Sequence, residues 1–304
     1  MNENNNCVIG LCVYNNERGL PSVLSNIVKL SQSKLFNKIT VVAFYDISSD
    51  KSYSILESFK NKYSHKYSHQ YDEVIETVII SNKTKEFRMS FGNASRVLDK
   101  SRTTRIATAR NEILNYMRFA HKWGEEGNKY FIMMDSNEYA CVGQINIETL
   151  RDALQRSDEW DSISFDREAG YYDYWALSFD PHIYSFYHLQ NKNETLERMV
   201  AGFTTKLNEA RKSCKLIPVY SAFNGFAIYK SNAFLNCSYS SMIHIPLFPK
   251  ELLPSKILNN FKNDCEHRKF HLEAIKKNGA RIMVSPLSIF YKLPIPNPSL
   301  RGPA

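Results

Sequence analysis

Four short apolar runs in the first half of the chain alternate with segments of helical pattern, and this alternation restricts the fold more than any other feature. The runs are CVIGLCVY, KITVVAFY, EVIETVII and YFIMMD, at residues 7–14, 38–45, 73–80 and 130–135. Runs with so few polar interruptions are typical of strands covered on both faces. Helices are expected between them, at residues 19–30, 50–60 and 103–123. This order predicts an α/β fold with a parallel, doubly wound sheet.

The second half of the chain is mixed. It reads as a helix at residues 145–155, a strand at 162–166, a charged helix at 193–213, two short strands around Asn224–Gly225, a helix stopped by Gly279, and a last strand at 281–284. The Pro-rich end, residues 285–304, is expected to be an extended arm. The chain shows no internal repeat and no linker of low complexity, so we expect one domain over residues 1–284, with its two halves meeting near residue 140.

Composition narrows the class of protein only weakly. The net charge is +8, but Lys and Arg are spread along the chain, as suits a phosphate-binding enzyme as well as a nucleic-acid binder. The six cysteines show neither CxxC pairs nor zinc spacing, and no apolar run is long enough to span a membrane. A signal-peptide pattern is also missing from the N-terminal residues. The expectation is a cytoplasmic protein with free thiols and no membrane span.

Polar residues follow three of the four predicted strands. The strand ends continue as YNNERGL, YDISSDKS and MMDSNEY, all rich in acids or amides. Turns favour such residues in any protein, so each segment alone is a weak signal. Ligands of open α/β sheets bind at the carboxyl ends of the strands, where these three segments would meet. The sequence therefore predicts a binding site at this edge of the sheet.

The first two of these segments resemble paired signatures of GT-A glycosyltransferases, which read approximately YNxE and DDGSxD. The resemblance implies a GT-A (Rossmann-like) fold: a mixed, mainly parallel sheet with helices on both faces. It also implies that Asp46 contacts the base of a nucleotide-sugar donor, with Tyr14, Asn15 and Glu17 at the opposite wall. Ser48 replaces the glycine of the second signature. Residues 1–140 would then bind the nucleotide and residues 141–284 the acceptor.

The segment RIATARNEIL, residues 105–114, resembles the arginine-bearing helix that precedes the metal motif in the same enzymes. Arg105 and Arg110 are five residues apart and so do not share one helix face. One could contact the donor phosphates while the other forms a salt bridge, since a guanidinium suits phosphate oxygens. The alternative for Arg105 is a solvated charge on the helix.

The third segment, MMDSNEY, stands where GT-A enzymes carry a DxD motif that holds Mn²⁺ or Mg²⁺ against the donor diphosphate. The resemblance implies Asp135 and Asn137 as metal ligands and Ser136 as a donor contact. Hard oxygen ligands suit such ions, but Asn brings no charge, so the expected metal site is weak.

Later blocks resemble a narrower group. YYDYWAL, VYSAFNGFAIYKSNAF and DCEHRKFH follow one another in the order found in the fungal capsule-associated α-1,3-mannosyltransferase family and in related glycosyltransferases of giant DNA viruses. With the preceding helix and the DSN turn, the resemblance covers about residues 105–292. It implies that Asp173 and Trp175 face the acceptor sugar, together with Asn224 and Gly225 of the NG turn. A viral origin would place the enzyme in the host cytoplasm.

The CEH block has a chemical interpretation of its own. Glu266 is expected at the start of a helix, where the dipole favours a carboxylate. It could act as general base for the acceptor hydroxyl, with Asp264 and Asp173 as the other catalytic candidates, or serve only as a helix-terminal acid. His267 could be a further metal ligand or an ordinary core histidine.

The hypothesis that these features favour is transfer of a hexose from a UDP- or GDP-sugar to a hydroxyl of a glycan or glycoprotein acceptor. Three alternatives stay open: a nucleic-acid-binding protein, a sugar-1-phosphate nucleotidyltransferase of related fold, and an inactive relative with the altered metal motif. The chain has no recognisable nucleic-acid-binding module, which argues against the first. The sugar, the nucleotide and the stereochemistry are not determined by the sequence.

Overall fold

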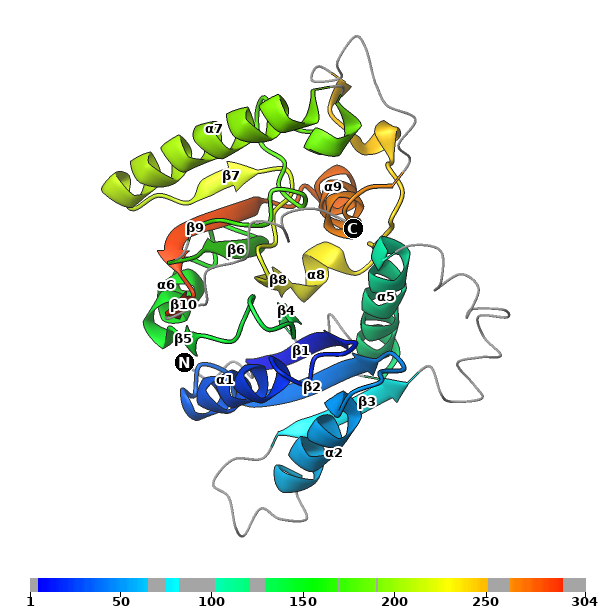
Figure 1. Cartoon of the computed structure of the whole chain (residues 1–304). Helices are drawn as coiled ribbons and strands as arrows, with labels where there is room; N and C mark the ends of the chain where they lie inside the picture. Colours follow the sequence, from blue (N-terminus) through cyan, green and yellow to red (C-terminus); the bar gives the residue numbers. More distant parts are fainter. Residues whose placement is uncertain are drawn as a thin grey trace.

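The computed structural model describes residues 5–64, 75–81, 102–120, 129–168, 170–189, 191–250 and 263–291. Its main sheet has eight strands, in the order β3-β2-β1-β4-β8-β6-β9-β7 (Figure 1). The strands are β1 (Asn6–Val13), β2 (Lys38–Tyr45), β3 (Glu76–Ser81), β4 (Tyr130–Asp135), β6 (Ser162–Asp166), β7 (Ile217–Val219), β8 (Phe226–Lys230) and β9 (Ile282–Ser288), while β5 (Gln144–Ile145) pairs separately with β10 (Phe290–Tyr291). The α-helices are α1 (Leu20–Gln32), α2 (Ser52–Lys62), α5 (Arg102–Ala120), α6 (Ile147–Gln155), α7 (Lys192–Ser213), α8 (Ser231–Phe234) and α9 (Glu266–Asn278).

The sheet is mixed but mainly parallel. Strands β3, β2, β1 and β4 are paired in parallel, as the alternating pattern predicts. Strand β8 is antiparallel to both of its neighbours, β4 and β6, and β6 is parallel to β9. The edge strand β7 is antiparallel to β9. The predicted α/β fold class, a mixed and mainly parallel sheet with helices on both faces, is confirmed.

Two hydrophobic cores cover the two faces of this sheet. Along β1, Ile9 and Leu11 point to the core formed with α1, α2 and α6, whereas Val8 belongs to the core formed with α5, α7 and α9. Side chains of a strand alternate between faces, so a strand with a core on each side must be apolar throughout. The continuous apolar runs of the sequence reflect this burial.

Two glycines set the ends of helices that approach the carboxyl edge. Gly279 ends α9 in the left-handed conformation (φ +63°), as expected of a helix-stopping glycine. Gly19 precedes α1, and a Cβ there would lie 2.6 Å from the carbonyl oxygen of Asn137. Only glycine lets the chain after β1 approach the turn after β4 this closely.

In the second half, two short strands do lie on either side of Asn224–Gly225, as predicted: β7 and β8. They are not paired with each other, because β7 lies at the sheet edge and β8 inside the sheet. The predicted arm begins too early, because β9 continues to Ser288 and β10 pairs with β5. Residues 292–304 of that arm, residues 121–123 of the predicted helix and most of the polar stretch 81–102 are outside the described ranges. Among the described helices, none combines the length and the apolar character that crossing a membrane requires.

Candidate active site

A cavity of about 420 Å³ lies at the carboxyl ends of β1, β2 and β4, a size usual for small-molecule sites. The first turns of α5, the loop at 172–175 and the start of α9 complete its walls. This is the edge of the sheet where the sequence predicts a site. The predicted site residues that line the cavity are Tyr14, Asp46, Arg105, Arg110, Asp135, Ser136, Asn137, Asp173, Trp175, Glu266 and His267.

The loops after β1 and β2 are hydrogen-bonded to each other. Asn15 Oδ1 accepts a hydrogen bond from Ser49 N at 2.9 Å. Glu17 N donates to Asp50 Oδ2 at 2.8 Å, and Lys51 N donates to Glu17 Oε2 at 3.2 Å. Asn15 and Glu17 do not line the cavity. In the structure they join the two loops whose other residues form the cavity wall, and their predicted contact with a nucleotide stays a prediction.

The end of β1 is tied in turn to the end of β4. The Ser136 hydroxyl is within hydrogen-bonding distance of Cys12 O, at 2.6 Å, and of Asn16 Oδ1, at 2.8 Å. Asn16 Oδ1 also accepts a hydrogen bond from Tyr14 N at 2.8 Å. Ser136 lies at the cavity, but its hydroxyl is directed to the protein rather than to a ligand. The contact that the structure shows for this hydroxyl is therefore structural, and its predicted contact with the donor stays a prediction.

Asn137 forms a local turn after β4. Its Oδ1 accepts hydrogen bonds from Tyr139 N at 3.2 Å and from Ala140 N at 2.8 Å. An amide oxygen has two lone pairs, and both are directed to this turn. The predicted metal-ligand role of Asn137 is not supported by this geometry.

Arg110 stands between two carboxylates at the floor of the cavity. Its Nη2 lies 3.1 Å from Asp135 Oδ1 and its Nε lies 3.2 Å from Glu266 Oε1. The guanidinium is 3% exposed and packs 4.6 Å from the ring centroid of Phe223. Burial alone would lower the pKa of Arg110, but the adjacent Cys12, Glu266 and Asp135 raise it well above its ordinary value. Arg110 therefore stays charged, and it is the arginine that forms the predicted salt bridge.

Arg105 lies one turn nearer the start of α5 and faces the cavity. Its guanidinium carbon is 4.5 Å from the ring centroid of Tyr14, which comes from the loop after β1. Arg102, the first residue of the helix, is exposed and also lines the cavity. The two arginines place positive charge on the cavity wall at the start of α5. This agrees with the predicted division of roles, with Arg110 in a salt bridge and Arg105 available to an anion.

The NG turn supports the cavity from behind. Asn224 Oδ1 accepts hydrogen bonds from Tyr172 N at 3.1 Å and from Asp173 N at 3.3 Å, and its Nδ2 donates to Phe165 O at 2.8 Å. A Cβ on Gly225 would lie 2.7 Å from the Tyr172 hydroxyl. Neither residue of the turn lines the cavity. In the structure they position the loop at 172–175, and their predicted role in acceptor binding stays a prediction.

Asp173 is the acid of this loop and the best placed for proton transfer. Its Oδ1 accepts a hydrogen bond from Ala176 N at 3.3 Å. Burial, together with the negative charges of Asp135 and Glu266, raises the pKa of Asp173 to about 7. A carboxyl group that titrates near neutrality in a cavity can both accept and release a proton at physiological pH.

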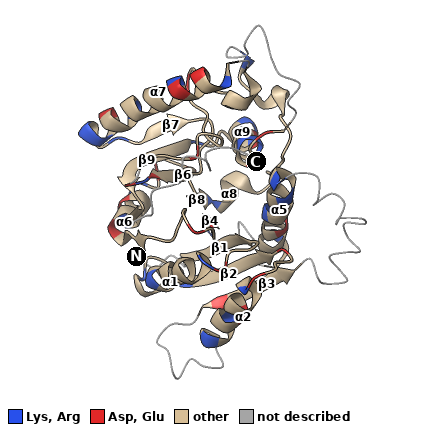
Figure 2. Cartoon of the chain, in the orientation of Figure 1, with Lys and Arg blue, Asp and Glu red and all other residues tan. Residues whose placement is uncertain are grey.

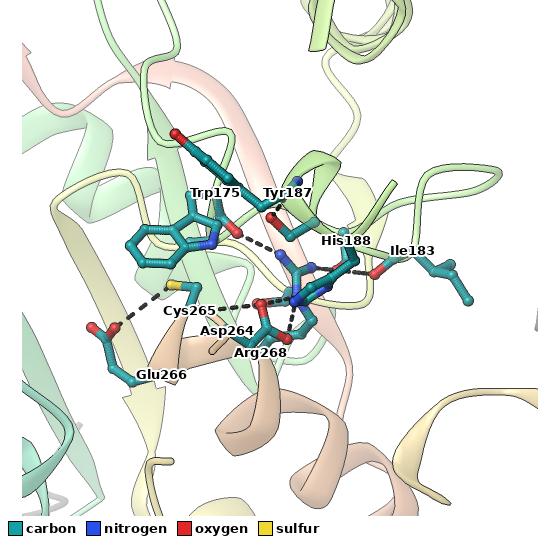
Figure 3. A network of polar contacts seen from close by, with 12 residues as sticks. Trp175, Ile183, Tyr187, His188, Asp264, Cys265, Glu266 and Arg268 are labelled. Atoms are coloured by element: carbon teal, nitrogen blue, oxygen red, sulfur yellow. Dashed lines mark hydrogen bonds and ion pairs between the residues drawn. The ribbon is translucent and has the colours of Figure 1, made fainter. Parts of the chain in front are cut away.

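Asp264 belongs to the network around Arg268, shown in Figure 3, which Cys265 joins to Glu266. Both of its oxygens lie 3.0 Å from Arg268 Nε, and Arg268 also donates to the carbonyl oxygens of Trp175 and Ile183. Arg268 is fully buried and Asp264 is 2% exposed. Asp264 does not line the cavity, so its place among the catalytic candidates is corrected. The network instead fixes the main chain of Trp175, whose side chain does line the cavity.

His267 lies flat against Phe223, with ring centroids 3.9 Å apart. Neither ring nitrogen has a hydrogen-bond partner, and Nε2 lies 3.5 Å from Glu266 Oε1. Burial and the nearby Arg110 lower the pKa of His267 well below its ordinary value, so the ring is neutral. In the described ranges, no group of three His, Cys, Asp or Glu side chains is arranged to hold a metal ion. With Asn137 in its own turn and Asp135 paired to Arg110, the predicted ligands do not form a fitting Mn²⁺ or Mg²⁺ site.

Several cavity residues were missed by the sequence analysis. Asn16 lies within the YNNE segment, from which only Tyr14, Asn15 and Glu17 are predicted as site residues. Tyr172 lies within YYDYW. Cys12 and Phe223 read as core residues because each continues an apolar stretch. Arg102 had only its charge and its position before the predicted helix as a signal.

Comparisons with known proteins give a fold likeness only. No protein-family profile matches the chain, and no curated protein matches it. Among solved structures, S. aureus TarS 1-349 in complex with UDP is 17% identical with a TM-score of 0.45, and the match covers 94% of this chain but 59% of that one. Glucosyl-3-phosphoglycerate synthase from Mycobacterium tuberculosis, in complex with Mn²⁺, UDP and phosphoglyceric acid, is 9% identical with a TM-score of 0.46, over 96% of this chain and 72% of that one. These values are too low to transfer any residue role, ligand or activity.

Proposed function

We propose that this chain is a glycosyltransferase that moves a hexose from a nucleoside-diphosphate sugar to a hydroxyl of a glycan or glycoprotein acceptor. The observation that carries the proposal is the cavity at the carboxyl ends of β1, β2 and β4, where the arginines of α5 face the half-buried acid Asp173. Arginines suit a diphosphate, and an acid of raised pKa suits proton transfer from a hydroxyl.

The proposed chemistry assigns a step to each side of the cavity. The acceptor oxygen attacks the anomeric carbon of the hexose, and the bond from that carbon to the diphosphate oxygen breaks. The nucleoside diphosphate leaves with the bonding electrons, and its charge is stabilised by the arginines of α5. The acceptor proton passes to the Asp173 carboxylate. Asp46, at the end of β2, is proposed to contact the nucleotide, and Trp175 the acceptor sugar.

Among the candidate bases, Asp173 is preferred to Glu266. Both line the cavity, but Glu266 Oε1 is already held by Arg110 Nε at 3.2 Å, so this oxygen is engaged by the guanidinium rather than directed at an acceptor hydroxyl. The pKa of Asp173 is raised to about 7. Efficient general bases titrate near the working pH.

The charge distribution gives no support to a nucleic-acid-binding function. Figure 2 shows Lys and Arg interspersed with Asp and Glu over several helices of the described chain, instead of gathered on one element. Binding to nucleic acid would need a basic face of some extent.

A ligand screen tests the proposed function. Thermal stability would be measured with UDP, GDP and the matching monophosphates, and hydrolysis with UDP- and GDP-sugars, with and without Mn²⁺. We expect stabilisation by one diphosphate, weaker stabilisation by its monophosphate, and loss of the effect in Asp46→Ala. Asp158→Ala, a matched change of charge on an exposed residue outside the cavity, is the control. If no nucleotide stabilises the protein and no donor is hydrolysed, the proposal is wrong.

A further inference from the structure

Arg110 occupies the position between two cavity carboxylates that would suit a bound cation. Its Nη2 is 3.1 Å from Asp135 Oδ1 and its Nε 3.2 Å from Glu266 Oε1. The Arg110 and Glu266 side chains are almost enclosed, with exposed fractions of 4% and 7%, while the Asp135 side chain is 24% exposed on the cavity side. A divalent cation bound to Asp135 would lie beside this fixed positive charge. The repulsion between them would weaken cation binding, because the buried guanidinium is poorly screened by water.

The other two predicted metal ligands, Asn137 and His267, are not arranged to bind a cation. Asn137 Oδ1 accepts two backbone hydrogen bonds in its own turn. The His267 ring is stacked on Phe223, with Nε2 3.5 Å from Glu266 Oε1. Metal sites of this kind need several oxygen ligands with net negative charge directed at one point. Here the two nearest carboxylates already share one guanidinium.

Two further arginines stand where a diphosphate would need positive charge. Arg102 and Arg105 line the cavity from the first turns of α5, and neither is in an ion pair with a described carboxylate. Arg105 is oriented by the ring of Tyr14, 4.5 Å from its guanidinium carbon. The start of a helix adds favourable N–H dipoles for an anion. The positive charge that the diphosphate needs is therefore supplied by arginines of α5, the same helix that carries Arg110.

We infer that this chain binds the donor diphosphate without a divalent metal: Arg102 and Arg105 contact the phosphates, while Arg110 neutralises the Asp135 and Glu266 carboxylates below them. The inference rests on the proposed function and specifies its mode of donor binding. It also assigns a reason to the Asn of the DSN turn. With no ion to hold, residue 137 needs no charge and serves the turn after β4.

The first test compares nucleotide affinity of the wild-type protein in EDTA and in Mn²⁺. Isothermal titration with UDP and with GDP gives the dissociation constant of whichever nucleotide binds. We expect values that agree within about threefold in the two conditions, because the phosphate contacts come from the protein. Binding seen only in Mn²⁺ would overturn the inference and leave the proposed function standing. Failure of every nucleotide in both conditions would overturn the proposed function, and the inference with it.

Two variants sharpen this test. Arg105→Ala should weaken nucleotide binding in EDTA by about 10- to 100-fold, the usual cost of a charge-assisted contact, and Arg105→Lys should weaken it less. Arg151→Ala is the matched control, since Arg151 lies on α6, pairs with Glu148 and is outside the cavity. Equal affinity in the Arg105→Ala and Arg151→Ala variants would contradict the inference.

Asp135→Asn separates the two modes by the direction of its effect. If a metal on Asp135 bridges the diphosphate, the variant loses Mn²⁺-dependent binding. If the arginines serve the diphosphate, removing a negative charge near the phosphates leaves affinity unchanged or raises it. A Mn²⁺ titration followed by electron paramagnetic resonance, with nucleotide present, is run on the wild type and on this variant as a direct readout of metal binding. Saturable Mn²⁺ binding that Asp135→Asn abolishes would refute the inference.

Discussion

Two buried arginines, Arg268 and Arg110, lie near the start of α9 and differ in what surrounds them. The Arg268 cluster, formed by Arg268, Asp264 and the carbonyl oxygens of Trp175, Leu177 and Ile183, is closed: the guanidinium is fully buried and outside the cavity (Figure 3). The Arg110 cluster, formed by Arg110, Asp135 and Glu266, is at the cavity floor.

The comparison shows how the same side chain serves stability in one place and chemistry in another. Around Arg268 the N–H donors bond to main-chain oxygens. These bonds fix the loop at residues 175–183, and the bonded groups are buried away from any ligand. Around Arg110 the partners are carboxylates that line a cavity, so their charge is felt by whatever enters. Substitutions at the two clusters should therefore separate folding from function.

The largest expected effect is on stability, from Arg268→Met. Removing the guanidinium leaves Asp264 buried and without its ion-pair partner, which typically costs about 3–5 kcal/mol. Urea denaturation followed by circular dichroism measures the change, with Arg151→Ala as the surface control at under about 1 kcal/mol. A loss as small as that of the control would show that the Arg268 cluster does not hold the loop.

Asp173→Asn should leave the fold intact and reduce turnover. The asparagine keeps the size of the side chain but cannot take the acceptor proton, and loss of a general base typically lowers kcat by about 10²–10⁴-fold. Nucleotide affinity should change little, because a base acts mainly in the transition state. Equal losses in kcat and nucleotide affinity would place Asp173 in donor binding instead.

The pH profile gives an independent measure of the same residue. The pKa of Asp173 is raised to about 7 by burial and by the charges of Asp135 and Glu266. A general base must be deprotonated to accept a proton. Wild-type kcat should therefore increase as the pH rises through about 7 and should be low at more acidic pH. The residual kcat of Asp173→Asn should not show this increase with pH. If the variant keeps the increase, the titration belongs to another group.

The fold could be predicted further than the site. Strands buried on both faces leave a local signal, so β1, β2 and β4 were found from their apolar runs. The place of strand β7 in the sheet could not be predicted, because it has three residues, one of them Pro218, and lies at the sheet edge, where burial leaves little pattern. Its pairing with β9 depends on contacts far along the chain, which no local pattern contains.

For the site, the sequence indicated the right segments more often than the right atoms. The strand-end motifs and the CEH block do meet at one cavity, because their positions follow from the topology. Which member of each motif faces the cavity depends on hydrogen bonds between loops, as in the contact of Asn15 with Ser49. Asp264 and Glu266 differ by two positions but pair with different arginines, Arg268 and Arg110, a distinction made by the packing of α9.

Glu266→Gln tests the Arg110 cluster, and its expected effect is smaller than that of Asp173→Asn. Gln keeps an oxygen that can accept from Arg110 Nε, and Asp135 still pairs with the same guanidinium. We expect kcat to fall by about tenfold, the usual cost of weakening one charge-assisted hydrogen bond, and less than in Asp173→Asn. Steady-state kinetics on both variants make the comparison. A fall as large as that of Asp173→Asn would restore Glu266 as the general base.

His267→Phe should have the smallest effect of all. The two ring nitrogens of His267 make no hydrogen bond, and the ring is neutral and stacked on Phe223, so its stabilising contribution is mainly that of an aromatic ring. Phenylalanine can make the same stack without two buried polar atoms that lack partners, so overpacking is the only expected cost, and we expect the free energy of unfolding to change by no more than about 1 kcal/mol. Nucleotide affinity in EDTA and in Mn²⁺ should match the wild type. A selective loss of affinity in Mn²⁺ would show that His267 is a metal ligand after all, and the Arg110 cluster would then have to open to admit the ion.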